Sequence, residues 1–278
     1  MRLSVIDTGT FKLDGGAMFG VVPKKIWNKI NPADENNLCT WAMRCLLVEI
    51  GNKLILIDCG LGDKQDDKFF GHYEPSRDVH LLDSINKAGY TPNEITDVFL
   101  THLHFDHCGG AIVRNASGKY EPQFKNATYY SHEKHWQWAI QPNAREKASF
   151  LVENILPIQE SGQLKLLNEP CEIAPNFSFI EVYGHTEAMM LPVIKYKEHN
   201  IVYMADLLPS AGHIPIPYVM AYDIRPLKTL EEKGSFLNDA VKNNTIIFFE
   251  HDRLYQACTI QQSDKGIRAA EYISIASL

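Results

Sequence analysis

Three histidines and one aspartate lie within six residues of this chain. They are His102, His104, Asp106 and His107. Side chains at positions i, i+2, i+4 and i+5 share no single face of a helix, and a strand would send the last one to its opposite face. Because four such groups are costly to pack together without a cation, the spacing predicts a metal site on a sharp turn after a strand. Gly109 and Gly110 follow directly and are typical of such a turn.

Three more candidate ligands stand just past apolar stretches that we expect to be buried strands. They are His185, Asp206 and His251, which follow 177–183, 201–204 and 245–249. A ligand at the end of a strand sits on a rigid scaffold, and several strand ends can point into one cleft. A single histidine more often makes an ordinary hydrogen bond, but beside the first cluster these three residues are favoured as its partners. Together the side chains predict a two-metal site.

The hydrophobic pattern predicts the elements that carry these residues. Apolar stretches predict strands at 42–50, 53–58, 95–100, 177–183, 201–204 and 245–249. The first two are joined by Gly51-Asn52, which is a two-residue hairpin signal. Helical spacing predicts helices at 78–88, 134–140, 145–155 and 227–241. Strands with interspersed helices favour sheets that pack together and are covered by helices.

Length and composition narrow the class of protein. The chain has 278 residues, of which 45% are hydrophobic, and a formal net charge of −7. The acidic balance argues against a nucleic-acid partner, and no run approaches the roughly 20 apolar residues of a membrane span. The first residues lack the pattern of a secretion signal, and the six cysteines form no zinc-thiolate motif. We therefore expect a cytoplasmic protein with reduced thiols, in which Cys108 is a buried space-filling residue rather than a reactive thiol.

The sequence resembles the metallo-β-lactamase superfamily. The HxHxDH pattern is complete, and the later His, Asp and His occur in the family's order. Leu56-Ile-Asp-Cys-Gly60 is similar to the family's strand-end Asp-Gly element, and Gly184-His185-Thr186 is similar to its Gly-His-Thr element. The resemblance covers nearly the whole chain. It implies a single α/β (α+β) domain over residues 1–278, a four-layer αββα sandwich with the metal site at one edge of the two sheets.

The same resemblance implies a role for each candidate ligand. By this likeness one metal is held by His102, His104 and His185, the second by Asp106, His107 and His251, and Asp206 bridges the two. Asp58 is similar to the carboxylate that orients a ligand histidine through its other ring nitrogen. Two divalent ions are implied; the donor set favours zinc and leaves manganese, iron and cobalt open.

Within the superfamily, segments 13–24 and 101–110 are similar to quorum-quenching lactonases and their methyl parathion hydrolase-like relatives. The implied activity is opening of a lactone, an N-acyl-homoserine lactone or a similar small molecule, by a hydroxide that two metals share. Asp206, or with less support Asp106, is the expected proton shuttle. Three alternatives stay open: a phosphotriester or other ester hydrolase, a mono-iron dioxygenase, and a non-catalytic metal-binding protein.

Two regions outside the ligands bear on the substrate. Segment 11–37 contains glycines and apolar side chains, including Met18 and Phe19. These residues favour a mobile flap that contacts an acyl chain. The alternative is that they belong to the ordinary core or form a homodimer contact. Smaller acyl-homoserine lactonases have a tyrosine three residues after the bridging aspartate, where this chain has Pro209. The candidates to replace that tyrosine are His213, Tyr218 and Tyr222.

Overall fold

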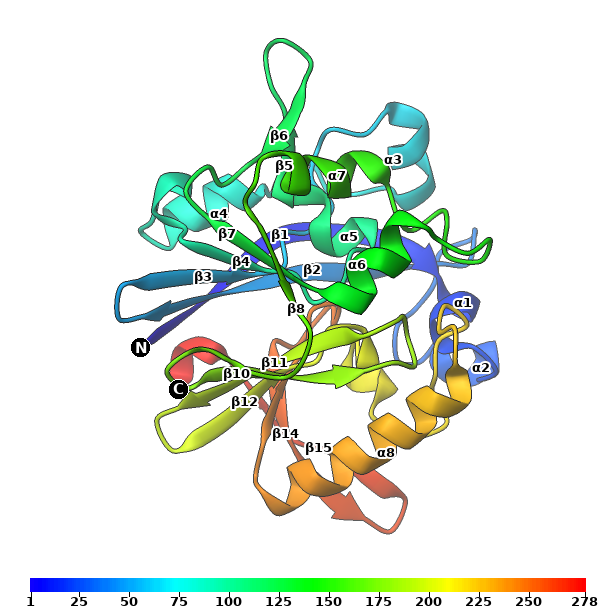
Figure 1. Cartoon of the computed structure of the whole chain (residues 1–278). Helices are drawn as coiled ribbons and strands as arrows, with labels where there is room; N and C mark the ends of the chain where they lie inside the picture. The colour runs from blue at the N-terminus through cyan, green and yellow to red at the C-terminus, as the bar shows by residue number, and fades with distance from the viewer.

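The computed structural model describes residues 1–278 as two β-sheets stacked face to face, with helices on the outer side of each (Figure 1). The first sheet has six strands in the order β1-β2-β3-β4-β7-β8. Their bounds are β1 (Arg2–Asp14), β2 (Leu38–Ile50), β3 (Lys53–Ile57), β4 (Asp97–Phe99), β7 (Thr128–His132) and β8 (Leu164–Leu167). Strands β1 to β3 pair antiparallel, whereas β4, β7 and β8 extend the sheet by parallel pairing.

The second sheet has seven strands in the order β15-β14-β13-β12-β11-β10-β9. Their bounds are β9 (Glu172–Ala174), β10 (Phe177–Val182), β11 (Met189–Tyr196), β12 (His199–Tyr203), β13 (Ile246–Phe248), β14 (Ala257–Ser263) and β15 (Gly266–Ile273). Only β12 and β13 pair in parallel in this sheet. A separate small hairpin is formed by β5 (Ile112–Arg114) and β6 (Tyr120–Pro122).

Eight α-helices surround the sheets. They are α1 (Gly15–Phe19), α2 (Lys24–Trp27), α3 (Asp67–Tyr73), α4 (Leu81–Lys87), α5 (Phe105–Cys108), α6 (Glu133–Ile140), α7 (Val152–Glu160) and α8 (Pro226–Lys242). Helices α4, α6 and α7 pack apolar side chains on the outer face of the first sheet, and α8 covers the second. Layers of helix, sheet, sheet and helix result, which confirms the predicted αββα sandwich.

Strands β2 and β3 show why the sheets stack. Leu46 and Ile57 are directly paired and lie in the core between the two sheets. Their neighbours Leu47 and Leu56, also paired, lie under the helices on the outer face. Because successive side chains of a strand point to opposite faces, a strand that is apolar throughout is buried on both sides.

Most predicted elements are confirmed, with ends that differ by a few residues, but the helix predicted at 145–155 is wrong. Helix α7 begins only at Val152. The Asn143 side-chain oxygen accepts hydrogen bonds from the backbone N–H groups of Arg145 and Glu146 at 2.9 and 3.2 Å. Such local side-chain to backbone bonds compete with a helix. The hydrophobic pattern also predicts no strand for β1, β5 to β9, β11, β14 or β15.

The candidate ligands follow four strand ends at one edge of the sandwich. Strand β4 belongs to the first sheet, and β10, β12 and β13 belong to the second.

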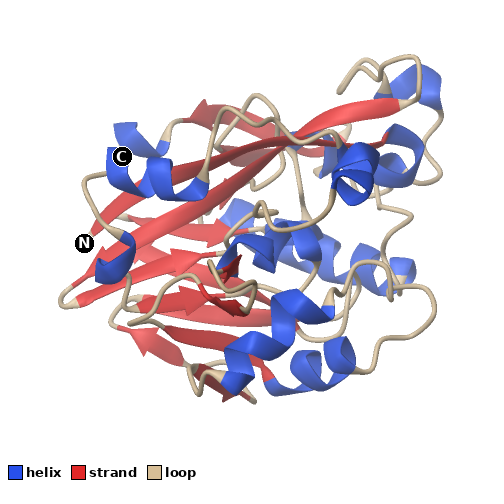
Figure 2. Cartoon of the chain, turned by 90° about the horizontal axis from the view of Figure 1, so that it is seen from above, coloured by secondary structure: helices blue, strands red, loops and turns tan.

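Figure 2 shows both chain termini together at one end of the sheets. None of the helices is long and apolar enough to cross a membrane.

Candidate metal centre

The motif at 102–107 combines an extended segment with a one-turn helix. His104 has extended backbone angles and immediately precedes α5, which carries Asp106 and His107 in its single turn. Gly109 and Gly110 do not adopt left-handed angles here. A Cβ on either would lie 2.0–2.1 Å from a carbonyl oxygen of the segment 59–61, so these glycines permit close approach of two backbones rather than a bend.

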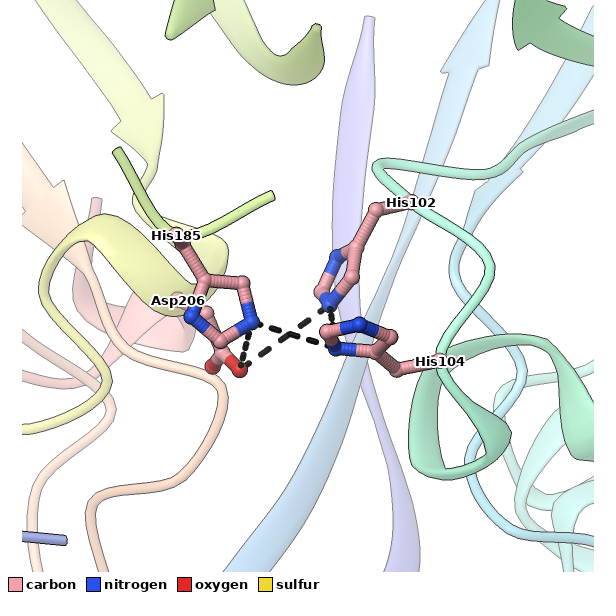
Figure 3. A group of neighbouring side chains, drawn as sticks. All are labelled: His102, His104, His185 and Asp206. Atoms are coloured by element: carbon pink, nitrogen blue, oxygen red, sulfur yellow. Dashed lines mark hydrogen bonds and ion pairs between the residues drawn. The ribbon is translucent and has the colours of Figure 1, made fainter. Parts of the chain in front are cut away.

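Three imidazoles and one carboxylate form the first candidate ligand set (Figure 3). The Nδ1 atom of His104 lies 3.1 Å from Nε2 of His102 and 3.1 Å from Nε2 of His185. Asp206 Oδ2 lies 3.1 Å from His185 Nε2. Nitrogen ligands of a tetrahedral zinc at about 2.05 Å would stand about 3.3 Å apart, so these spacings fit a divalent ion.

The second ligand set contains Asp106, His107 and His251. The Nε2 atoms of the two histidines are 3.2 Å apart, and Asp106 Oδ2 lies 3.7–3.8 Å from each. Asp206 faces this set as well, with Oδ2 3.6 Å from His107 Nε2 and Oδ1 3.3 Å from His251 Nε2. Its carboxylate therefore stands between the two sets, as a bridging ligand must.

The second ring nitrogen of most of these histidines has a partner that fixes the ring. His185 Nδ1 lies 2.8 Å from Asp223 Oδ1, and His251 Nδ1 donates to the carbonyl oxygen of Ala42 at 2.7 Å. His107 Nδ1 lies 3.1 Å from Asp58 Oδ2. Such partners hold the other nitrogen toward the metal in the correct tautomer.

Burial and neighbouring charges set the protonation states of the candidate ligands. Burial and the adjacent imidazoles hold the pKa of His102 well below its usual range, so the ring is neutral. Burial opposes ionisation of Asp206, but the imidazoles of His185, His107 and His251 hold its pKa well below the usual range. Neutral imidazole and ionised carboxylate are the forms that bind metal. Neighbouring carboxylates outweigh burial and raise the pKa of His107, His185 and His251, so these rings must release a proton when metal binds.

Glu146 is a buried carboxylate at this site that sequence reasoning missed. It accepts hydrogen bonds from Thr186 Oγ1 and Trp138 Nε1, both at 2.7 Å, and its Oε1 lies 3.6 Å from His104 Nε2. Burial works against ionisation, yet His104 and these hydrogen bonds lower the pKa of Glu146 to about 2. Glu146 therefore presents a negative charge behind His104. Because it lies inside the segment wrongly predicted as a helix, no sequence signal marked it.

Glu250 is a second missed carboxylate. Its Oε2 lies 3.0 Å from His107 Nδ1, on the same nitrogen that faces Asp58. Burial, together with the negative charge of Asp58, raises the pKa of Glu250 to about 7. Asp58 makes the hydrogen bond to this nitrogen, whereas neither oxygen of Glu250 has a hydrogen-bond partner. Its position directly before His251 was the available signal.

A cavity of about 290 Å³ opens over both ligand sets. Met18 and Tyr222, two of the predicted substrate contacts, line it. So do Tyr73, Glu146 and Met220, which were not predicted. A larger cavity of about 450 Å³ elsewhere contains none of the candidate ligands.

Three other predicted substrate contacts, Phe19, His213 and Tyr218, do not line this cavity. His213 is buried and stacks on Phe19 with ring centroids 4.7 Å apart. Its Nε2–H donates to the carbonyl oxygen of Met18 at 2.9 Å, and its Nδ1 accepts from Ser210 Oγ at 2.8 Å. Because both ring nitrogens have partners inside the protein, His213 links the segments around Ser210 and Met18 and has no free group for a substrate.

Comparison with known proteins agrees with this geometry. A family model described as metallo-beta-lactamase superfamily matches residues 44–251. An N-acyl homoserine lactonase from Bacillus cereus is 22% identical over 244 residues, which cover 80% of this chain and 85% of that protein.

Solved structures extend the likeness to almost the whole chain. A probable metal-dependent hydrolase from Staphylococcus aureus superposes with a TM-score of 0.89 at 28% identity, covering 98% of this chain and 96% of that one. AidC, a dizinc quorum-quenching lactonase solved with a product, superposes with a TM-score of 0.80 at 21% identity, covering 98% and 95%. With its fold, its two ligand sets and the family match in agreement, the chain belongs to the metallo-β-lactamase superfamily.

Proposed function

We propose that the protein is a dinuclear metal-dependent hydrolase that opens the ring of a lactone, an N-acyl-homoserine lactone or a similar molecule. One observation carries this proposal: the Asp206 carboxylate faces both ligand sets at 3.1–3.6 Å. Two sets that share one carboxylate suit a pair of ions acting on one substrate. The likeness to lactonases supports the substrate class.

The donor chemistry fits the implied ions. We propose that one ion is held by His102, His104 and His185, the other by Asp106, His107 and His251, with Asp206 between them. When bound, such ions supply Lewis acidity and lower the pKa of water. Imidazole and carboxylate donors favour zinc and accept manganese, iron or cobalt.

The cavity walls suit an amphiphilic ester. Met18 and Met220 offer apolar surface for an acyl chain. Burial raises the pKa of Tyr73 to about 12, and burial also raises that of Tyr222, so both hydroxyls stay protonated at neutral pH. We propose Tyr222 as the hydrogen-bond donor in place of the tyrosine absent at Pro209.

Ring opening leaves an alkoxide that needs a proton. Asp206 stands between the ligand sets, and Asp106 lines the cavity. We propose Asp206, with Asp106 as the alternative, as the group that carries a proton from the attacking water to the leaving oxygen. A positioned water and two Lewis acids would also serve a phosphotriester, which remains the second candidate substrate.

Segment 11–37 contributes to the cavity and to the surface. Met18 lines the cavity, whereas Val21 and Ile26 are exposed. We propose that these exposed side chains offer a homodimer contact. Sedimentation of the protein with and without Val21→Asp would test it: an unchanged monomer in both cases contradicts the contact.

The function is tested by assaying purified protein against acyl-homoserine lactones of several chain lengths and an organophosphate triester. Acid release should follow lactone addition, stop after chelation and return when zinc is restored. Metal analysis should give two ions per chain. Hydrolysis that is indifferent to chelators, or a protein that binds no metal, contradicts the proposal; preference for the triester selects the alternative.

A further inference from the structure

Helix α8 buries a lysine on the stripe that faces the protein. Its buried residues are Thr229, Lys233, Leu237 and Ala240. This spacing is that of one helix face, where an apolar residue is expected. The Lys233 side chain is nonetheless fully buried, a rare position for a lysine.

The Lys233 ammonium group is satisfied by main-chain oxygens alone. Its Nζ donates to the carbonyl oxygens of His213, Pro215 and Tyr218 at 3.0, 3.1 and 2.8 Å. An ammonium group has three donors, so all of them are used. Because Nζ has no free proton to offer and Lys233 does not line the cavity, direct contact with substrate is excluded.

The carbonyls belong to residues 209–223, which we name the roof segment. It runs from just after Asp206 to Asp223, the partner of His185, so both of its ends adjoin the ligand sets. Between these ends, Met220 and Tyr222 line the cavity. A shift of the segment would therefore move cavity walls and leave most ligands in place.

The roof segment is fastened to the N-terminal helix as well. The Ala221 N–H donates to the carbonyl oxygen of Ala17 at 2.8 Å, beside the His213 to Met18 bond. A Cβ at Gly20 would lie 2.3 Å from the Val219 carbonyl oxygen, so the two backbones are in close contact. Lys233 of α8 and the α1 region therefore contact the roof segment at different points.

We propose that Lys233 is a positioning residue that fixes the roof segment and thereby sets how tightly the cavity binds its substrate. This inference rests on the proposed hydrolase function for its kinetic consequence only. A methionine at 233 would fill similar space but leave the carbonyl oxygens of His213 and Tyr218 without a donor, because only the Pro215 oxygen keeps a second partner, the Tyr218 N–H at 2.9 Å. The segment can relieve this loss only by moving toward water.

The test compares metal-loaded Lys233→Met with the wild type and with Lys242→Met, a control that removes an exposed lysine of the same helix. Amide hydrogen exchange in 213–222 should rise about tenfold or more in Lys233→Met and stay unchanged in the control. Lactone KM should rise about 10-fold to 100-fold, with kcat within about threefold and two metals retained. Lys233→Gln, whose amide can restore part of the donation, should lie between.

Unchanged exchange in 213–222 in both folded Lys233 variants overturns the proposal. So does a fall in kcat or metal content at constant KM, because that result would place Lys233 with the ligands. If Lys233→Met does not fold, Lys233→Gln decides by the same exchange measurement. If the wild type hydrolyses no ester, the proposed function fails, while the exchange result still decides whether Lys233 fixes the roof segment.

Discussion

The ligand motif at 102–107 and the roof segment at 209–223 enclose the same cavity in different ways. The motif supplies four candidate ligands from one short stretch that follows a strand end. The roof segment is held by contacts from far along the chain, such as His213 with Met18, 195 residues away. The difference teaches that the donor residues of the motif are set by local spacing, whereas the shape offered to a substrate depends on tertiary packing.

Replacement of Asp206 should have the largest effect, and it tests the contribution of the candidate ligands. Asp206→Asn removes the charge that faces both ligand sets and should lower activity more than about 100-fold, with loss of at least one metal ion. Activity assays with metal analysis of the purified variant measure both. If both ions and full activity persist, Asp206 is not a bridge, and the centre does not depend on it.

Asp223 links the roof segment to the first candidate ligand set, because it ends the segment and contacts His185. Asp223→Ala leaves the His185 ring unanchored and should weaken metal affinity about 10-fold to 100-fold. Competition with a fluorescent chelator measures this change. Asp239→Ala, an exposed carboxylate on α8, is the control. Equal affinities in the two variants would separate the roof segment from the metal centre.

The buried ring of His213 makes the stability of the protein depend on pH. Burial lowers its pKa in the folded state to about 3, from 6.5. Between these values the unfolded state binds more protons, so His213 makes the folded state lose stability as pH falls below 6.5. His213→Gln, neutral throughout, should remove about 1.6 kcal/mol of the stability lost between pH 6.5 and 5.

Urea unfolding of chelated wild type and variant at both pH values gives the difference. Chelation keeps metal release, which also depends on pH, out of the comparison. Parallel losses of stability in the two proteins would show that His213 becomes protonated without cost, and hence that it is not a buried brace.

The smallest effect concerns the substrate side. Tyr222→Phe removes one hydroxyl that lines the cavity and should cost about 1 kcal/mol, roughly a fivefold loss in kcat/KM, with metal content unchanged. Tyr73→Phe is the matched comparison, because Tyr73 also lines the cavity. A loss confined to Tyr73→Phe would move the hydrogen-bond donor from the roof segment to α3.

Sequence reasoning reached the ligand motif and the strand ends because each depends on local spacing. It found Asp58 through a resemblance, and it identified the strands before His185, Asp206 and His251. It missed Glu146, because the Asn143 side chain replaces the expected helix by a turn. It did not anticipate Asp223 or Lys233, since each acquires its role only by packing against a distant segment. No periodicity records such contacts.

The placement of the ligands on both sheets has a consequence for cohesion. The motif follows β4 of the first sheet, and the other three ligands follow strands of the second. Ions held there would join the two halves of the sandwich across the seam between them. Since binding to the native state alone adds RT ln(1 + [metal]/Kd) to its stability, the melting temperature should rise with free metal concentration. The centre would then also stabilise the packing of the two sheets against each other.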